Sequence, residues 1–201
     1  MIAALYVDPR GPYADRDDVD PWDEERDARL YDGPHPVVAH PPCARWGRYW
    51  SGGPNPQAKR RLKGDDGGCF EAALASVRRW GGVLEHPEAS HAWARFGIPK
   101  PPRKGGWIEA EGGWTCCVEQ GHYGHRSRKM TWLYYAGPDK PFDLIWGKSP
   151  SGERLDEGYH SKEERAAAVA AGAKPRKRLS AKQNILTPEP FAALMISLAG
   201  I

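Results

Sequence analysis

The chain has 201 residues, with 29 Lys and Arg against 26 Asp and Glu, which gives a formal net charge of +3 at pH 7. This length suits one domain with a buried core, and 23 glycines with 19 prolines indicate many loops, so the composition favours a soluble α/β protein over a helical bundle. No stretch resembles a signal peptide or an apolar membrane span, and we expect a cytoplasmic protein with no membrane partner. Four cysteines in such a chain are expected to be free thiols, a nucleophile or metal ligands rather than disulfides.

The first expected element is a strand over residues 2–7, an apolar run that ends at Asp8-Pro9. The segment 15–32 follows and carries a dense series of acidic side chains. We expect this segment to form a loop and a short helix around residues 23–31.

The second expected strand, residues 37–39, leads into Pro41, Pro42 and Cys43. Two prolines cannot donate to a sheet ladder, so the strand should stop there and present Cys43 at its carboxyl end. Ligands bind at such strand ends in open α/β sheets. Basic neighbours such as Arg45 can lower the pKa of a thiol toward the reactive thiolate. The alternative interpretation is a buried, inert cysteine.

A polar, glycine-rich and basic stretch over residues 51–68 is expected to be a mobile loop. Apolar residues then recur at helical spacing over 70–80, and Gly81-Gly82 provides a stop. Residues 82–87 predict a third strand that again ends at a proline, and residues 88–96 predict a short helix.

Residues 100–113 suit a Pro/Gly loop, and residues 114–119 and 131–136 suit two strands. The basic, His-containing loop 121–129 connects those two strands. Residues 142–146 suit one more strand.

The chain divides into one domain over residues 1–150, a basic and partly disordered insert over 151–178 with a helical piece at 163–171, and a C-terminal helix within 179–201 that packs back on the domain. Thr187 is the expected N-cap of that helix, with Pro188 at its first position.

Two strand ends therefore present reactive groups, the thiol of Cys43 and the carboxyl group of Glu85. Together they suit attack on a pyrimidine ring. The thiolate adds to C6, and an acid whose pKa is raised by burial protonates or hydrogen-bonds N3, which makes C5 nucleophilic.

At these residues the sequence resembles a family. Pro41-Pro42-Cys43 is similar to the Pro-Pro-Cys loop of the DNA cytosine-5 methyltransferases, and Glu85-His86-Pro87 is similar to their Glu-Asn-Val or Glu-Asn-Pro strand end. The closest resemblance is to short, phage-type members, in which a Tyr/Phe-Gly-His loop, a Lys-x-Thr strand and a C-terminal Thr-Pro helix follow in the same order. The resemblance covers roughly residues 33–146 and the last twenty residues.

The resemblance implies a Rossmann-like, methyltransferase-type sheet with flanking helices, DNA as the partner and S-adenosylmethionine as the cofactor. It implies Cys43 as the nucleophile and Glu85 as the acid at N3. The residues expected to bind the substrate are His40, Pro42, Arg45, His86, His125, Arg126, Arg128 and Lys129.

The N-terminal cofactor half departs from the family pattern. The turn after the first strand has one glycine and two prolines where the family has Phe-x-Gly-x-Gly. Asp8, Asp20 and Trp22 are the residues expected to contact a ribose and an adenine. Two further hypotheses follow from this departure: a catalytically silent DNA-binding relative, and a pyrimidine-modifying enzyme that uses another one-carbon donor.

Two other patterns carry weaker expectations. Cys116-Cys117 with His122 and His125 offers zinc-type ligands, but adjacent cysteines on a strand point to opposite faces, so zinc is not expected. Basic clusters, which suit either phosphate contacts or solvated surface, occur at residues 59–63, 126–129 and 174–178.

Overall fold

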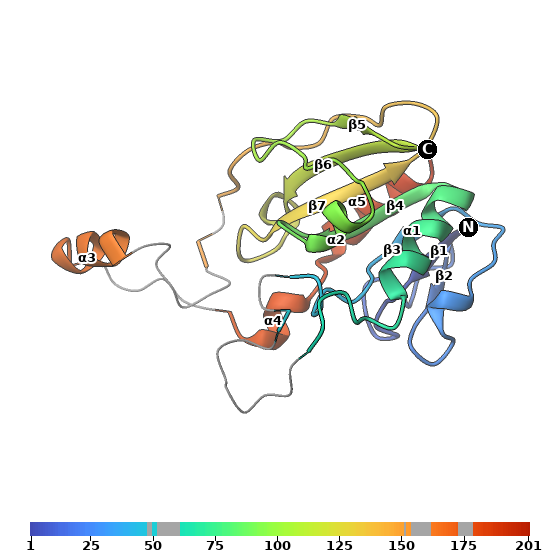
Figure 1. Cartoon of the computed structure of the whole chain (residues 1–201), viewed down its shortest axis with the longest axis horizontal. Coiled ribbons are helices and arrows are strands. Elements are labelled where there is room, and N and C mark those ends of the chain that lie inside the picture. The colour runs from blue at the N-terminus through green and yellow to red at the C-terminus, as the bar shows by residue number, and fades with distance from the viewer. Residues whose placement is uncertain (48–49, 52–60, 151, 154–161, 173–178) are drawn as a thin grey trace.

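The computed structural model describes residues 1–47, 50–51, 61–150, 152–153, 162–172 and 179–201. Within these residues, one seven-stranded sheet has the order β2-β1-β3-β4-β7-β6-β5 (Figure 1). Its strands are β1 (Ile2–Leu5), β2 (Val19–Trp22), β3 (Val37–Ala39), β4 (Gly82–Pro87), β5 (Ile108–Ala110), β6 (Gly113–Glu119) and β7 (Met130–Ala136). The helices are η1 (Ala28–Leu30), α1 (Cys69–Trp80), α2 (His91–Arg95), η2 (Gln120–Tyr123), α3 (Lys162–Ala170), α4 (Ala181–Ile185) and α5 (Glu189–Ala199).

The sheet has a parallel half and an antiparallel half. Strand β1 pairs in parallel with both β2 and β3, and β3 pairs in parallel with β4. From β4 onward the pairs β4–β7, β7–β6 and β6–β5 are antiparallel. The chain moves from β1 to β2 on one side and then to β3 on the other, so the strand order reverses at β1. Such a reversal opens a crevice at the carboxyl ends of the strands.

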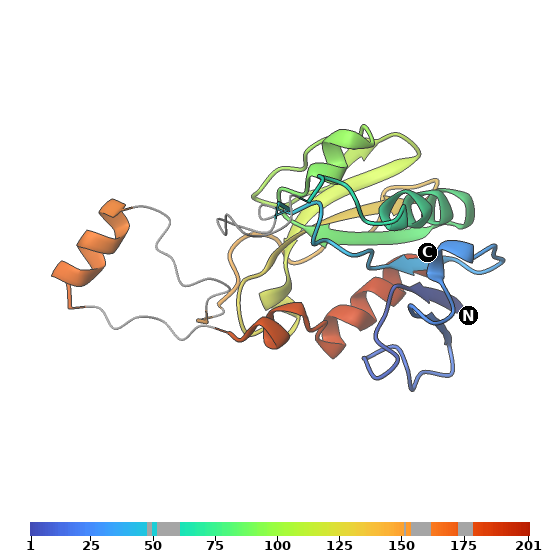
Figure 2. The ribbon, with the colours of Figure 1, turned by 60° about the horizontal axis from the view of Figure 1, so that its bottom comes forward.

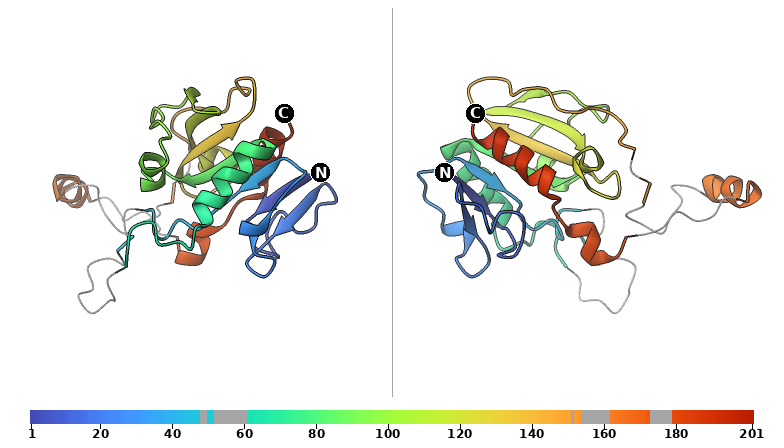
Figure 3. Two further views of the ribbon diagram at one scale, coloured as in Figure 1. Left: turned by 45° about the vertical axis from the view of Figure 1, so that its right-hand side comes forward. Right: turned by 180° about the vertical axis from the view of Figure 1, so that it is seen from behind.

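Alternate residues of the strands bury against two layers of helix. On one face, α1 and α2 supply Phe70, Leu74, Val77 and Trp93 to the core. On the other face, α5 supplies the buried side chains Phe191, Met195 and Leu198. Figure 2 shows α1 and α5 on opposite sides of the sheet, and the rear view in Figure 3 shows α5 running across its far face. The expectation of an α/β fold is confirmed at this level, as a mixed sheet with few helices.

Several local expectations were wrong, for identifiable reasons. Residues 19–22 form the edge strand β2 rather than loop, because a proline is tolerated where one side of a strand has no partner. Edge strand β5 likewise interrupts the expected loop 100–113. Residues 142–146 form no strand, because the carbonyl of Phe142 accepts from Trp107 Nε1 and the N–H of Ile145 donates to Tyr123 Oη.

The C-terminal helix also begins one residue later than expected. Pro188, not Thr187, is the N-cap of α5, and Pro190 occupies its first turn. A short preceding helix, α4, was not expected from the sequence; Ser180 and Gln183 form its capping box. Residues 52–60 of the expected mobile loop 51–68, and the whole basic tail 174–178, lie outside the described residues.

Gly82 fixes the spacing between β3 and β4 and gives a test of the parallel half. A Cβ at this position would lie 2.0 Å from the Val37 carbonyl oxygen, which cannot move without separating the strands. At Gly97, which shares a positive φ, a Cβ would meet nothing within 4 Å. We expect Gly82→Ala to cost at least about 2 kcal/mol more than Gly97→Ala in urea denaturation, since both carry the left-handed strain and only one has the clash. Equal losses would contradict this β3–β4 register.

Candidate active site

The carboxyl ends of β3 and β4 place two ionisable side chains together. Ala39 lies opposite Leu84 in the parallel register, so the next residues, His40 and Glu85, follow on the same face of the sheet. Their side chains are largely buried, with exposed fractions of 12% and 13%. His40 Nδ1 lies 3.1 Å from Glu85 Oε2.

Three further side chains extend this pair into a network. Tyr13, from the segment after β1, places its Oη 2.8 Å from His40 Nε2. Gln120, directly after β6, donates from Nε2 to Glu85 Oε1 at 3.3 Å and to Thr131 Oγ1 at 2.9 Å. The network therefore joins segments from both halves of the sheet at the switch point.

Glu85 is a carboxylate in this network. Burial acts to raise the pKa of Glu85, but the hydrogen bond from His40 and the positive charges of His40 and Lys129 outweigh it and hold this pKa below its ordinary value. The sequence-based expectation of a raised pKa was wrong, because it considered burial and not the cationic partners that tertiary structure supplies.

The thiol of Cys43 is at the surface of the protein. The protein atoms around it desolvate the thiolate and raise the pKa of Cys43, and the Glu85 carboxylate raises it further, while Lys129 acts in the opposite direction. The expected lowering by basic neighbours does not occur. Arg45 instead directs its guanidinium to the Trp50 carbonyl oxygen, at 3.5 Å.

Lys129 lies at the entrance of β7 and faces both reactive groups. Burial lowers the pKa of Lys129, and the nearby Glu85 and Cys43 raise it. Its backbone has a φ of 35°, and its Nζ donates to the Leu186 carbonyl oxygen at 3.3 Å. The structure thus brings together Cys43, Glu85, His40 and Lys129 from the residues that the sequence singled out, and Pro42 lies exposed beside Cys43.

His86 lies on the opposite face of β4 from Glu85. Its side chain is 1% exposed, its Nδ1 lies 2.7 Å from Ser90 Oγ, and its ring stacks on Trp93 with centroids 6.2 Å apart. The carbonyl groups of Pro41 and Pro42 act on this imidazole from the other side. This placement does not bring His86 to the face of β4 that carries Glu85.

Burial is the main cause that lowers the pKa of His86, to about 4 from 6.5, against the opposing influence of Glu85 and the proline carbonyls. A folded-state pKa below the unfolded value means that the unfolded chain binds the proton first, so this stability is present above pH 6.5 and is lost as the pH falls toward 4. We expect a loss of about 3 kcal/mol from this group across that range. Urea denaturation at several pH values measures it, and His86→Asn should show a much flatter profile. An equally steep profile in the variant would assign the loss to other groups.

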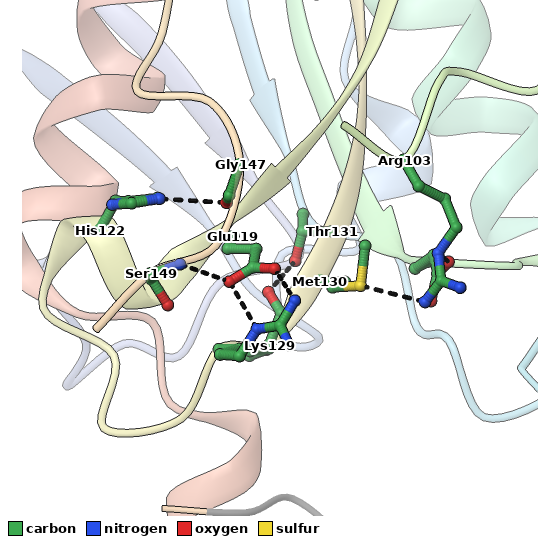
Figure 4. A network of polar contacts seen from close by, with 10 residues as sticks. Arg103, Glu119, His122, Lys129, Met130, Thr131, Gly147 and Ser149 are labelled. Carbon is green, nitrogen blue, oxygen red and sulfur yellow. Dashed lines mark hydrogen bonds and ion pairs between the residues drawn. The ribbon is translucent and has the colours of Figure 1, made fainter. Parts of the chain in front are cut away.

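The basic loop before β7 is held by its own partners. His125 is buried against the backbone of Ser127, whose N–H lies 3.1 Å from Nδ1. Arg126 pairs with Glu153 at 2.6 Å. Arg128 pairs with Glu119, whose side chain is 5% exposed. Glu119 also accepts from the Ser149 N–H at 2.8 Å (Figure 4). Both arginines are therefore already neutralised by carboxylates, and neither is brought to Cys43.

The three residues expected at the cofactor are also engaged. Asp20 accepts from Trp22 Nε1 at 2.8 Å and from Arg26 at 2.6 Å, and the Arg26 guanidinium covers the Trp22 ring at 4.0 Å. Asp8 pairs with Arg10 and lines an open, acidic depression with Val7, Pro9, Asp23, Glu24 and Glu25. Arg26 covers one face of the Trp22 indole, and the Asp20 carboxylate already accepts two hydrogen bonds. In this arrangement Asp8, Asp20 and Trp22 do not fit a ribose and an adenine.

The zinc-type pattern is not assembled. Cys116 and Cys117 are both buried, and they belong to the core clusters of opposite faces of the sheet. His122 lies 3.1 Å from the Gly147 carbonyl oxygen, as Figure 4 shows. Across the described residues, no group of three or more His, Cys, Asp or Glu side chains could hold a metal ion. The described helices also include none that is long and apolar enough to cross a membrane.

Sequence reasoning missed Tyr13 and Gln120, and it used Thr131 only as part of a motif. Tyr13 carries no local signal, because its role depends on the loop after β1 folding over His40. Gln120 directly follows a strand that the sequence did predict, so a search of all strand ends would have found it. Comparison with protein-family models, curated proteins and solved structures finds no match to this chain.

Proposed function

We propose that this chain is a DNA cytosine-5 methyltransferase-like protein in which Cys43 attacks C6 of a flipped cytosine and Glu85 engages N3. The single observation that carries the proposal is the parallel register of β3 and β4, which brings the exposed Cys43 loop and the buried Glu85 carboxylate to adjacent strand ends. A surface thiol beside a buried carboxylate supplies both groups that covalent attack on a pyrimidine needs.

The charges suggest when the thiol becomes reactive. In the free protein, desolvation of the thiolate and then the Glu85 carboxylate raise the pKa of Cys43, which favours the protonated thiol. Once Glu85 shares a proton with N3 of the base, its negative charge no longer opposes the thiolate. Cys43 would then be activated by the substrate itself, while Lys129 continues to favour the anion.

The fold and the surface next to Cys43 support the same proposal. Four parallel strands with a switch point at β1, followed by antiparallel strands, are compatible with a Rossmann-like methyltransferase sheet whose cofactor half is reduced. Beside the Cys43 loop, Lys63 lies 5.2 Å from the centroid of the Trp50 ring. An aromatic ring with an adjacent cation suits a displaced base and its phosphate.

S-adenosylmethionine is not assigned as the donor of the carbon group, because Asp20 and Trp22 are occupied by each other and by Arg26. The same observation favours a second candidate, a DNA-binding relative that has kept the base pocket and lost the cofactor site. The acidic depression beside Asp8 is a poor match for a phosphate and leaves a cationic donor as the compatible class.

Mass spectrometry of nucleosides from DNA co-expressed with the protein tests the proposal. We expect a modified cytosine that disappears with Cys43→Ser and persists with Cys69→Ser, a half-buried thiol at the start of α1. A mass increase other than one methyl group would identify a different one-carbon donor. Unmodified cytosine together with DNA binding would favour the silent relative.

A further inference from the structure

His40 is held at both ring nitrogens by residues that can exchange a proton. Nε2 lies 2.8 Å from Tyr13 Oη, and Nδ1 lies 3.1 Å from Glu85 Oε2. With the proton on Nδ1, the imidazole donates to the carboxylate and accepts from the phenol; with both nitrogens protonated, it is a cation beside Glu85. The hydrogen bond made by one nitrogen of an imidazole determines whether the other nitrogen carries a proton.

The other charged groups around the ring define its field. Lys129, one residue before β7, acts electrostatically on Glu85. Cys43, in the loop after β3, also lies close enough to Glu85 for the two charges to interact. Tyr13 in turn lies near Glu189 of α5 and near Arg16, and burial raises its pKa well above the ordinary value, so the phenol keeps its proton. His86 acts on Glu85 from the opposite face of the sheet. Of these neighbours, only Tyr13 and Glu85 hydrogen-bond to the imidazole in the described residues.

We propose that His40 is the proton reservoir for Glu85, so that the His40–Glu85 pair, rather than Glu85 alone, supplies the proton that N3 of the pyrimidine receives. His40 is a positioning residue here, since it acts through Glu85 and does not touch the base. The inference rests on the proposed function and names the proton source that the function needs.

The step balances without any further reactant. The S–H bond of Cys43 breaks, the sulfur forms a bond to C6, and N3 gains one proton. The pair starts as an imidazolium beside a carboxylate, and Glu85 passes the imidazolium proton to N3. The proton released by the thiol then returns to His40, so the pair ends with the charge it had at the start.

The experiment follows adduct formation with a DNA duplex that carries pyrimidin-2-one in place of cytosine, because addition to C6 of this base needs no methyl donor. The rate is measured against pH for the wild type, His40→Asn and Tyr13→Phe. Asparagine places an amide N–H near the Nδ1 position but cannot titrate. Circular dichroism confirms that each variant is folded, and His40→Gln is a second variant if His40→Asn is not.

The wild type should show a high-pH limb, in which the rate falls as the pH rises because the pair loses the proton that it gives to N3. In His40→Asn that limb should be absent, and the rate at pH 7 should fall by about 10²-fold or more. Tyr13→Phe should keep the limb, because both members of the pair remain. A purely structural role would give both variants the same profile.

Two results are distinguishable failures. If the wild type forms the adduct and His40→Asn keeps the same pH dependence, the reservoir is wrong and the proposed function stands. If the wild type forms no adduct at any pH while it binds the duplex, the proposed function itself is wrong, and the inference falls with it.

Discussion

Replacing Glu85 with Gln is expected to slow the attack of Cys43 on a pyrimidine by about 10²–10⁴-fold, because the group that delivers a proton to N3 is lost. The same change should make Cys43 more reactive toward iodoacetamide at neutral pH. After desolvation, the Glu85 carboxylate is the second cause that raises the pKa of Cys43, so its removal lowers that pKa and increases the thiolate fraction, by up to about tenfold for each unit of pKa. Opposite changes in the two reactions are a result that general unfolding would not produce.

Glu88→Gln is the matched control for this experiment. Glu88 lies just beyond β4 and pairs with Arg103 at 2.8 Å, away from the network of His40. Both rates should be unchanged in the control. If Glu85→Gln left the alkylation rate of Cys43 unchanged, the coupling between the carboxylate and the thiol would be wrong.

Arg128→Ala is expected to destabilise the protein by about 2–3 kcal/mol, because it leaves the buried Glu119 carboxylate with the neutral N–H of Ser149 in place of an ion pair. The loss is smaller than for a fully buried pair, because the Arg128 side chain is 41% exposed and solvent screens its charge. Glu119 connects the end of β6 to the segment around Ser149 through the Ser149 N–H, which donates to Glu119 Oε2 at 2.8 Å (Figure 4). Urea denaturation of the variant and the wild type at pH 7 measures the loss.

Arg126→Ala provides the comparison. Its partner is Glu153, and the two side chains are 51% and 20% exposed, so the loss should stay within about 1 kcal/mol. Equal destabilisation by the two variants would show that burial of Glu119 does not decide the effect. A large loss for Arg128→Ala would also explain why Arg128 is unsuited to bind a DNA phosphate, since it would have to give up its ion pair with Glu119.

Local patterns were sufficient to predict the strands that build the site. The apolar runs at 37–39 and 82–87 each end at prolines, and both form the expected parallel strands β3 and β4. The alternation of side chains along a strand also predicts where His86 lies. Because it directly follows Glu85 in β4, its side chain must point to the opposite face of the sheet. The expectation that His86 binds the substrate together with Glu85 came from the resemblance to the family and did not take this alternation into account.

The charge states could not be predicted from local sequence. The pKa of Glu85 depends on His40 and Lys129, which come from different elements, and the partner of Arg126 is Glu153, from a distant segment. Likewise, β2 contains Pro21 and was not expected as a strand, because its position at the sheet edge follows only from the topology. These features depend on which segments tertiary structure brings together.

The measurement that tests the central claim most directly is the intact mass of the protein after incubation with the pyrimidin-2-one duplex. We predict a covalent protein–DNA complex in which peptide mapping places the attachment at Cys43, formed by the wild type and by Cys69→Ser but not by Cys43→Ser. No complex with the wild type under conditions where it binds the duplex, or an attachment that persists in Cys43→Ser, would contradict the assignment of Cys43 as the nucleophile.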